Sequence, residues 1–342
     1  MMQTIKKVIA IAMVIAVVMA ATTTVLFAKS TVSSYTDKDF NSKIEMFLKE
    51  NYKDYYDLNS FNFVYKDSEE FQDSVEIVVS CNMELVKRAE ALPVLQGISK
   101  TFKTKAMFSN NDVSAHNSSS LSAYGQLSRE IEQNYYRKPE RTYFNFLIGK
   151  DQDMKIENLK LLSYKEILGL DSLRINEEEL YKKGEEIATY LLSDNNDAES
   201  SLESRSRYSV YDRLRARDYA LDHAYDPPEY SSDCANFVSQ CLCYGGGIPQ
   251  SYYWRPGSDN WIRTGYYNNG GVVPYMVNNG YFVREYDRSN VNAGCIVSWN
   301  GFSHVGLITY GDTVTVKYTA HTNARRNEVL PYNAYVSFYM YR

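Results

Sequence analysis

The segment SSDCANFVSQCLCYGGG, residues 231–247, has the pattern of a short helix that starts in a polar loop. Ser232 or Asp233 is suited to cap the first turn, and the glycines at 245–247 end the helix. Cys234 then occupies the first helical position. The predicted buried side of the helix consists of Phe237, Val238, Cys241 and Leu242.

Cys234 is the predicted nucleophile. At a helix start, unpaired backbone N–H groups and the helix dipole favour negative charge, so the pKa of a thiol falls from roughly 8.5 toward neutrality. The carboxylate of Asp233 opposes this effect. Cys241 and Cys243 are interpreted as packing residues. Cys-x6-Cys-x-Cys on one helix cannot converge on one ion, so we expect no metal and no cofactor.

A reactive thiolate needs a base, held in place by a third polar group. A predicted hairpin that turns at Gly311–Asp312 carries His304 near one end and His321 near the other. If Tyr310 pairs with Thr313 across this turn, the two histidines share one face as diagonal neighbours, roughly 7–8 Å apart at Cβ. We therefore expect one imidazole to orient the other.

The segments DCANFVSQCL, SHVGLIT and AHTN together resemble the bacterial putative amidase domain family, which is related to the papain-like cell-wall hydrolases of the NlpC and CHAP groups. The matching positions are 233–240, His304, His321–Thr322, the tryptophan segment that starts at Trp261 and continues as a helix to Asn279, and the helix over 211–225. The resemblance covers residues 207–342. Gly294–Cys295 replaces an expected Gly-Asp, and Ser303 replaces an acid, which leaves the third catalytic member open between His321 and Asn323.

The resemblance implies a papain-like α+β domain, with the Cys234 helix packed on an antiparallel sheet. In this reading Cys234 attacks an amide carbonyl, His304 transfers the proton and His321 fixes the imidazole tautomer. The implied substrates are the peptide or amide bonds of peptidoglycan.

Four further residues are candidates for the site. The backbone N–H of Cys234 is an expected oxyanion donor, with Tyr225 or Asp233 as further support. Trp254 and Trp261 are candidates for the wall of the substrate cleft, with a place in the apolar core as the alternative.

The N-terminus has the pattern of a secretory signal. Lys6 and Lys7 precede the apolar run Val8–Ala21, and Ala28 or Ala20 is the expected last residue before cleavage. An uncleaved membrane anchor is the alternative. Either form places the rest of the chain outside the cytoplasm, secreted or in the cell envelope, and restricts membrane contact to this segment.

Composition and periodicity divide the remaining chain. A signal over 1–28 is followed by a small α+β domain over 37–170, a helix plus disordered linker over 171–206, and the catalytic domain over 207–342. The expected elements are helices over 40–56, 84–98, 121–136 and 177–192, a strand over 75–79 and a hairpin of 143–148 with 156–162. The linker's polar composition cannot bury enough apolar surface to fold.

The net charge of −5 argues against a nucleic-acid partner. The five cysteines suggest no disulfide framework, which leaves a reactive thiol available. The expected function is thus an exported cysteine-dependent amide or peptide hydrolase. The alternatives are an acyl or peptidyl transferase with the same residues, and a non-catalytic envelope-binding module.

Overall fold

The computed structural model describes residues 37–108, 116–193, 211–265, 270–299, 301, 303–322 and 324–342. The expected signal segment, residues 194–206 of the linker and Asn323 lie outside these ranges. Among the described helices, none combines the length and the apolar character needed to cross a bilayer.

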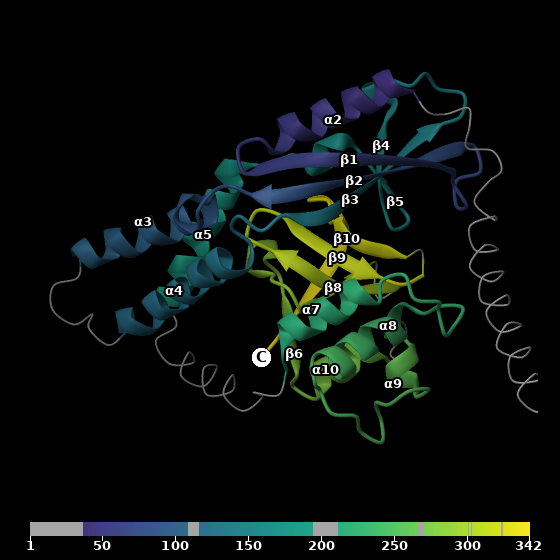
Figure 1. Ribbon diagram of the computed structural model, residues 1–342. Helices are drawn as coiled ribbons and strands as arrows, with labels where there is room; N and C mark the ends of the chain where they lie inside the picture. Colours follow the sequence, from purple (N-terminus) through teal and green to yellow (C-terminus); the bar gives the residue numbers. More distant parts are fainter. Residues whose placement is uncertain are drawn as a thin grey trace, which may run out of the picture.

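The N-terminal part is a twisted antiparallel sheet with one helix on its outer face (Figure 1). Its helices are α2 (Lys38–Tyr52), α3 (Pro93–Phe108), α4 (His116–Asn134) and α5 (Glu177–Ser193), and its strands are β1 (Tyr56–Asp67), β2 (Ser74–Leu85), β3 (Glu140–Gly149), β4 (Lys160–Ser163) and β5 (Glu166–Leu168). Asp37 caps α2 by accepting from the N–H groups of Asp39 and Phe40. Helical spacing places Phe40, Ile44, Leu48 and Tyr52 on the buried side of α2.

The prediction of a helix over Glu84–Ile98 is wrong for the first half of that range. Glu84 and Leu85 still belong to β2, where they pair with Asp57 and Tyr56 of β1. The helix begins only at Pro93, since proline lacks the N–H that a first helical residue does not need. Of the expected hairpin, 156–158 forms a 3-10 turn and pairing with β3 starts at Lys160.

The C-terminal part packs four short helices on one face of a second group of strands (Figure 1). The helices are α7 (Arg213–Asp222), α8 (Cys234–Gln240, continued by a π-helical turn Cys241–Gly245), α9 (Asp259–Ile262) and α10 (Val272–Asn278), and the strands are β6 (Phe282–Glu285), β7 (Ile296–Trp299), β8 (His304–Gly311), β9 (Val316–Ala320), β10 (Arg325–Val329) and β11 (Val336–Tyr341). The helix expected to run from Trp261 to Asn279 is wrong. The chain breaks between α9 and α10, where Gly270 and Gly271 adopt positive φ.

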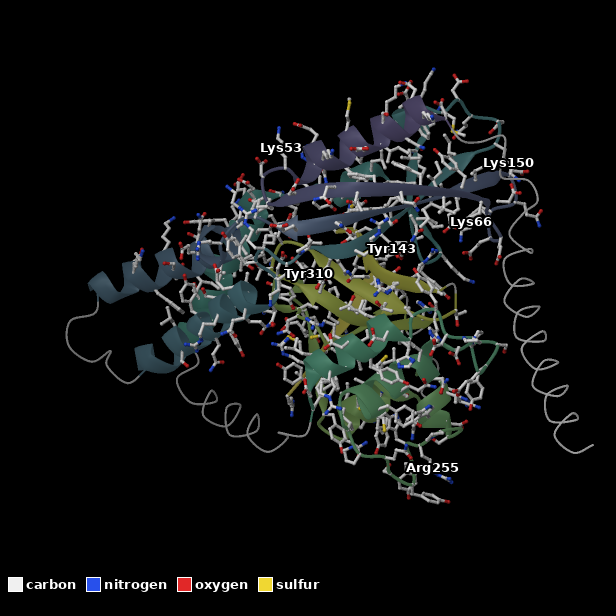
Figure 2. The ribbon with its side chains drawn as sticks, viewed as in Figure 1. Lys53, Lys66, Tyr143, Lys150, Arg255 and Tyr310 are labelled. Atoms are coloured by element: carbon white, nitrogen blue, oxygen red, sulfur yellow. The ribbon has the colours of Figure 1, made fainter. Side chains whose placement is uncertain are left out.

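Both groups of strands form one sheet, in the order β1-β2-β3-β10-β9-β8-β7-β11-β6. Strands β3 and β10 join the groups and run parallel, with Glu328 beside Tyr143. Figure 2 shows Tyr143 and Tyr310 where the groups meet. The mixed α+β class is confirmed. The boundaries of the two expected domains and the papain-like character of the C-terminal domain stay predictions. Strands that precede and strands that follow the expected linker belong to one continuous sheet.

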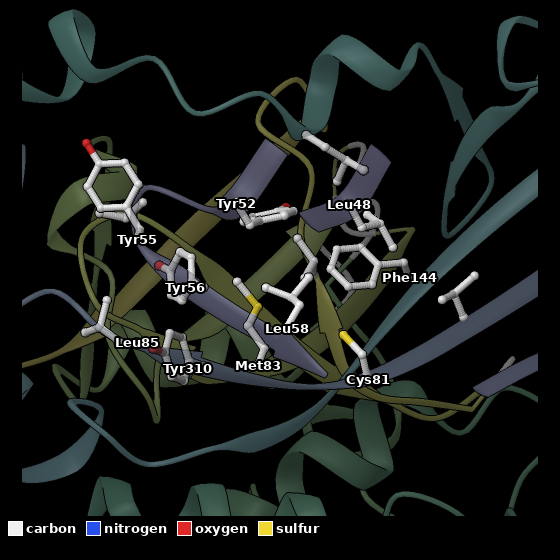
Figure 3. Close-up of a cluster of buried hydrophobic side chains, with 14 of the residues drawn as sticks. Leu48, Tyr52, Tyr55, Tyr56, Leu58, Cys81, Met83, Leu85, Phe144 and Tyr310 are labelled. Carbon is white, nitrogen blue, oxygen red and sulfur yellow. The ribbon is translucent and has the colours of Figure 1, made fainter. Parts of the chain in front are cut away.

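The junction between the two groups of strands is buried and partly charged. Arg325 lies between the carboxylates of Glu76 (3.0 Å) and Glu328 (3.3 Å). Burial raises the pKa of Glu328 to about 7, against the opposing effect of Arg325. Tyr310 of β8 lies among Tyr56 and other core residues of the N-terminal strands (Figure 3). Separating the two parts would expose these groups to water.

Candidate active site

Cys234 is the first residue of α8, and its thiol is closed off from solvent. The helix packs Phe237 and Val238 against Val305 and Leu307 of β8, as the apolar stripe predicted. Cys234 is 2% exposed. The backbone N–H groups of β8 at Val305 and of α8 at Ala235 hydrogen-bond the thiol.

The expectation of a low thiol pKa is wrong for this conformation. Burial raises the pKa of the Cys234 thiol above its ordinary value, and hydrogen bonds from the N–H groups of Val305 and Ala235 and from Ser232 only partly oppose that effect. The reason is the loss of water around the sulfur, because desolvation penalises the charged form of an acid. The thiol is therefore protonated while the site is closed.

His304 begins β8 and lies beside Trp299 of β7. The ring is 2% exposed, and Nδ1 is buried without a hydrogen-bond partner. Burial lowers the pKa of His304 to about 3, and the charges of Arg325 and Lys165 lower it further in the same direction. The imidazole is thus neutral near pH 7 and keeps one nitrogen free to accept a proton.

His321 lies one residue beyond β9 and has no free nitrogen. It donates through Nδ1 to Asp233 Oδ2 (2.7 Å) and through Nε2 to the carbonyl oxygen of His223 (2.9 Å). Its ring also stacks on Phe237, with 4.0 Å between centroids. Because each ring nitrogen is already engaged by one of these partners, neither nitrogen of His321 is open toward Cys234 in this arrangement.

The prediction that the two histidines share a face is wrong. Tyr310 pairs with Lys317, but Ile308 pairs with Tyr318, so β8 carries one extra residue at a bulge. A one-residue irregularity moves every later side chain to the other face. His321 accordingly faces α8, whereas His304 faces Trp299 on the opposite side of the sheet.

Asp233 holds the start of α8 in place. Of the two expected caps, Ser232 and Asp233, it is Asp233 that occupies the cap position, but its side chain accepts no hydrogen bond from a backbone N–H of the first turn. Oδ1 accepts instead from the Tyr230 N–H (3.2 Å) and Asn236 Nδ2 (2.9 Å), and Oδ2 accepts from His321. Both oxygens thus hold the loop before α8 in place, and support of an oxyanion by Asp233 stays a prediction.

Of the remaining predicted site residues, Asn323 lies outside the described ranges. Trp254 and Trp261 are fully buried in the same core cluster as Cys234, and their indole N–H groups donate to Ser239 and Asn236, as the core alternative predicts. Tyr225 is 59% exposed. All five cysteines are free. Within the described ranges, no three His, Cys, Asp or Glu side chains are grouped to hold a metal ion.

Sequence reasoning missed Tyr164. This residue lies in the turn between β4 and β5, and its ring stacks on that of His304 at 4.0 Å between centroids and 4° between planes. No chemical motif surrounds it in the sequence, so only the meeting of β4–β5 with β8 reveals the contact.

Comparisons with known proteins agree with the resemblance drawn from the motifs. Residues 210–341 match the putative amidase domain family. Over 115 residues the chain is 31% identical to the "Uncharacterized protein YhbB" of Bacillus subtilis (strain 168), an alignment covering 31% of this chain and 36% of that relative. The chain thus matches well under two thirds of the relative's length. No solved structure matches the chain. The C-terminal part is accordingly similar to the putative amidase domain family over residues 210–341.

Proposed function

We propose that this protein is an exported cysteine hydrolase that cleaves peptide or amide bonds of peptidoglycan, with Cys234 as nucleophile and His304 as base. One observation carries the proposal. Cys234, at a helix start, belongs to the same buried cluster as Val305, the strand residue that follows His304, and His304 has a buried, unpaired Nδ1. Unpaired buried polar atoms of this kind are uncommon in protein interiors, and a catalytic role is one explanation for them.

In the proposed reaction, the proton of Cys234 Sγ passes to Nδ1 of His304, and the thiolate attacks the amide carbonyl carbon. Because the His304 ring faces the side of the sheet away from α8 in this closed conformation, the step requires the site to open so that the two groups meet. The backbone N–H of Cys234, at the helix start, is the proposed donor to the negative oxygen of the tetrahedral intermediate. His304 then returns the proton to the leaving nitrogen, and a thioester remains. Water, activated by His304, releases the acid and restores the thiol.

His321 and Asp233 have a positioning role in this proposal. Their 2.7 Å hydrogen bond joins the end of β9 to the residue before Cys234. A second contact reinforces it, because the Asp233 N–H donates to Thr322 Oγ1 at 2.8 Å. Together these contacts fix where the thiol lies relative to β8.

The cellular place of the reaction is inferred from the sequence. Lys6 and Lys7 followed by the apolar run Val8–Ala21 favour export, and the family resemblance favours a cell-wall substrate. Proteins of the envelope encounter peptidoglycan as the abundant source of amide bonds between amino acids and sugars.

The test is to incubate the chain from residue 29 onward with peptidoglycan fragments and to measure product masses. We expect products heavier by one water per cleavage, none from Cys234→Ser, and wild-type amounts from the matched control Cys241→Ala. Unchanged cleavage by Cys234→Ser would exclude this nucleophile. An added primary amine separates hydrolysis from transfer, because a transferase would form the amine adduct instead of the acid.

A further inference from the structure

The turn between β4 and β5 covers the proposed base. Tyr164 lies flat on the His304 ring and also contacts Trp299, with 6.1 Å between those centroids. Tyr164 is close enough to Cys234 that the charge of a thiolate would act on its hydroxyl, raising the pKa of Tyr164 in addition to the effect of burial. Tyr164, from the turn between β4 and β5, therefore lies directly over the proposed base.

The site is closed to a substrate in this conformation. Cys234 and His304 are each 2% exposed, although attack on a peptide requires the sulfur to touch a carbonyl carbon. Accepting the proposed function, we infer that Tyr164 is an autoinhibitory cover, which must swing away from His304 before an amide substrate reaches Cys234. The cover belongs to the N-terminal group of strands and the reacting residues to the C-terminal part, so activity depends on how the two parts are joined.

The hairpin that carries Tyr164 is suited to move. Strand β5 pairs with β4 alone, and β4 pairs with β3 through two residues. Tyr164 has a φ of 53°, a left-handed conformation that costs energy for a bulky side chain.

Polar contacts outside the hairpin also hold this turn. Lys165 Nζ lies 3.4 Å from Glu70 Oε1, and the Tyr335 N–H donates to Glu166 Oε2 at 3.2 Å. Opening therefore breaks the stack on His304 together with contacts such as these.

The experiment compares Tyr164→Asn with Tyr164→Phe in the full chain. Asparagine tolerates the left-handed conformation and favours such turns, so the first variant removes the ring without destabilising the hairpin. Phenylalanine keeps the ring and serves as the matched control. The readout is the rate at which iodoacetamide alkylates Cys234, followed by peptide mass, with the partly exposed Cys243 as an internal reference.

We expect Tyr164→Asn to accelerate alkylation of Cys234 by about tenfold, and Tyr164→Phe to react at the wild-type rate, while Cys243 reacts equally in all three proteins. An unchanged Cys234 rate in Tyr164→Asn overturns the cover, even if hydrolysis falls. Equal acceleration by both variants also overturns it, because the stacked ring would not be what protects the thiol. Faster alkylation without any peptidoglycan cleavage supports the cover and counts against the proposed function alone.

Discussion

Two histidines of the same hairpin lie in contrasting environments, on opposite faces of the sheet. His321 is hydrogen-bonded through both ring nitrogens, to Asp233 and to the carbonyl of His223. His304 is equally buried, but its Nδ1 has no partner. A buried imidazole with every nitrogen satisfied stabilises the structure, whereas one with an open nitrogen is available for proton transfer.

The contrast extends to the surroundings of each ring. His321 packs on the helix that carries the nucleophile and is joined to Asp233 next to Cys234. His304 is covered by Tyr164, a residue of the distant N-terminal strands. The environment of His321 consists of C-terminal residues alone, whereas that of His304 is assembled from both parts of the chain.

The largest expected difference is in turnover. His304→Gln should lower the rate of cleavage by roughly 10²–10⁴-fold, because general acid–base catalysis is lost. His321→Gln keeps an amide donor for Asp233 and should retain a measurable fraction of the activity. Cleavage of peptidoglycan fragments by the two purified variants checks this. A greater loss in His321→Gln would reverse the two roles.

Stability should show the opposite order. His321→Leu leaves the 2% exposed Asp233 without its partner and should lower the free energy of unfolding by roughly 3 kcal/mol, as for other broken buried pairs. His304→Leu replaces a ring whose Nδ1 is unpaired and should change stability by less than about 1 kcal/mol. Urea unfolding of both variants measures the difference. Equal losses would mean that His304 has a structural partner.

The pH dependence of stability should separate the histidines further. The pKa of His304 is lowered from 6.5 to about 3 on folding, so the unfolded chain binds a proton that the folded protein excludes. This contribution of His304 to the free energy of unfolding is then fully present above pH 6.5. It falls as the pH drops toward 3, by roughly 2 kcal/mol between pH 7 and pH 5. The free energy of unfolding of His304→Leu should lack this part of the pH dependence. Glu328 acts equally in both proteins and cancels in their comparison.

The smallest effect concerns the backbone next to the nucleophile. Thr322→Val keeps the shape of the side chain but removes the acceptor for the Asp233 N–H, and should cost roughly 1 kcal/mol of unfolding free energy. Thr322→Ser retains a hydroxyl and is the control. Thermal unfolding of the two variants is sufficient. If both variants unfold at the same temperature, the hydrogen bond does not stabilise the loop that precedes Cys234.

The helix of Cys234 could be predicted because its signals are local. Polar residues precede it, glycines follow it, and apolar residues recur at helical spacing. The strand position of His304 was predictable for the same reason. The expected turn at Gly311–Asp312 was too short, because Asp312 Oδ1 accepts from the N–H groups of Val314 and Thr315 and Oδ2 accepts from the hydroxyls of Tyr310 and Tyr56. Tyr56 is a strand residue more than two hundred positions away, so no local pattern reveals that contact.

The sequence by itself determined which residues we propose for the chemistry: a cysteine at a helix start, and a histidine at a strand start. These depend on caps, glycines and periodicity, which act over a few residues. The tertiary structure decided which histidine is free to react, because one bulged residue in β8 changes the face on which the histidine lies. It also decided that the thiol is protonated and the site closed, because burial by packing outweighs the hydrogen bonds that favour the thiolate, and Tyr164 of the β4–β5 turn covers the ring of His304.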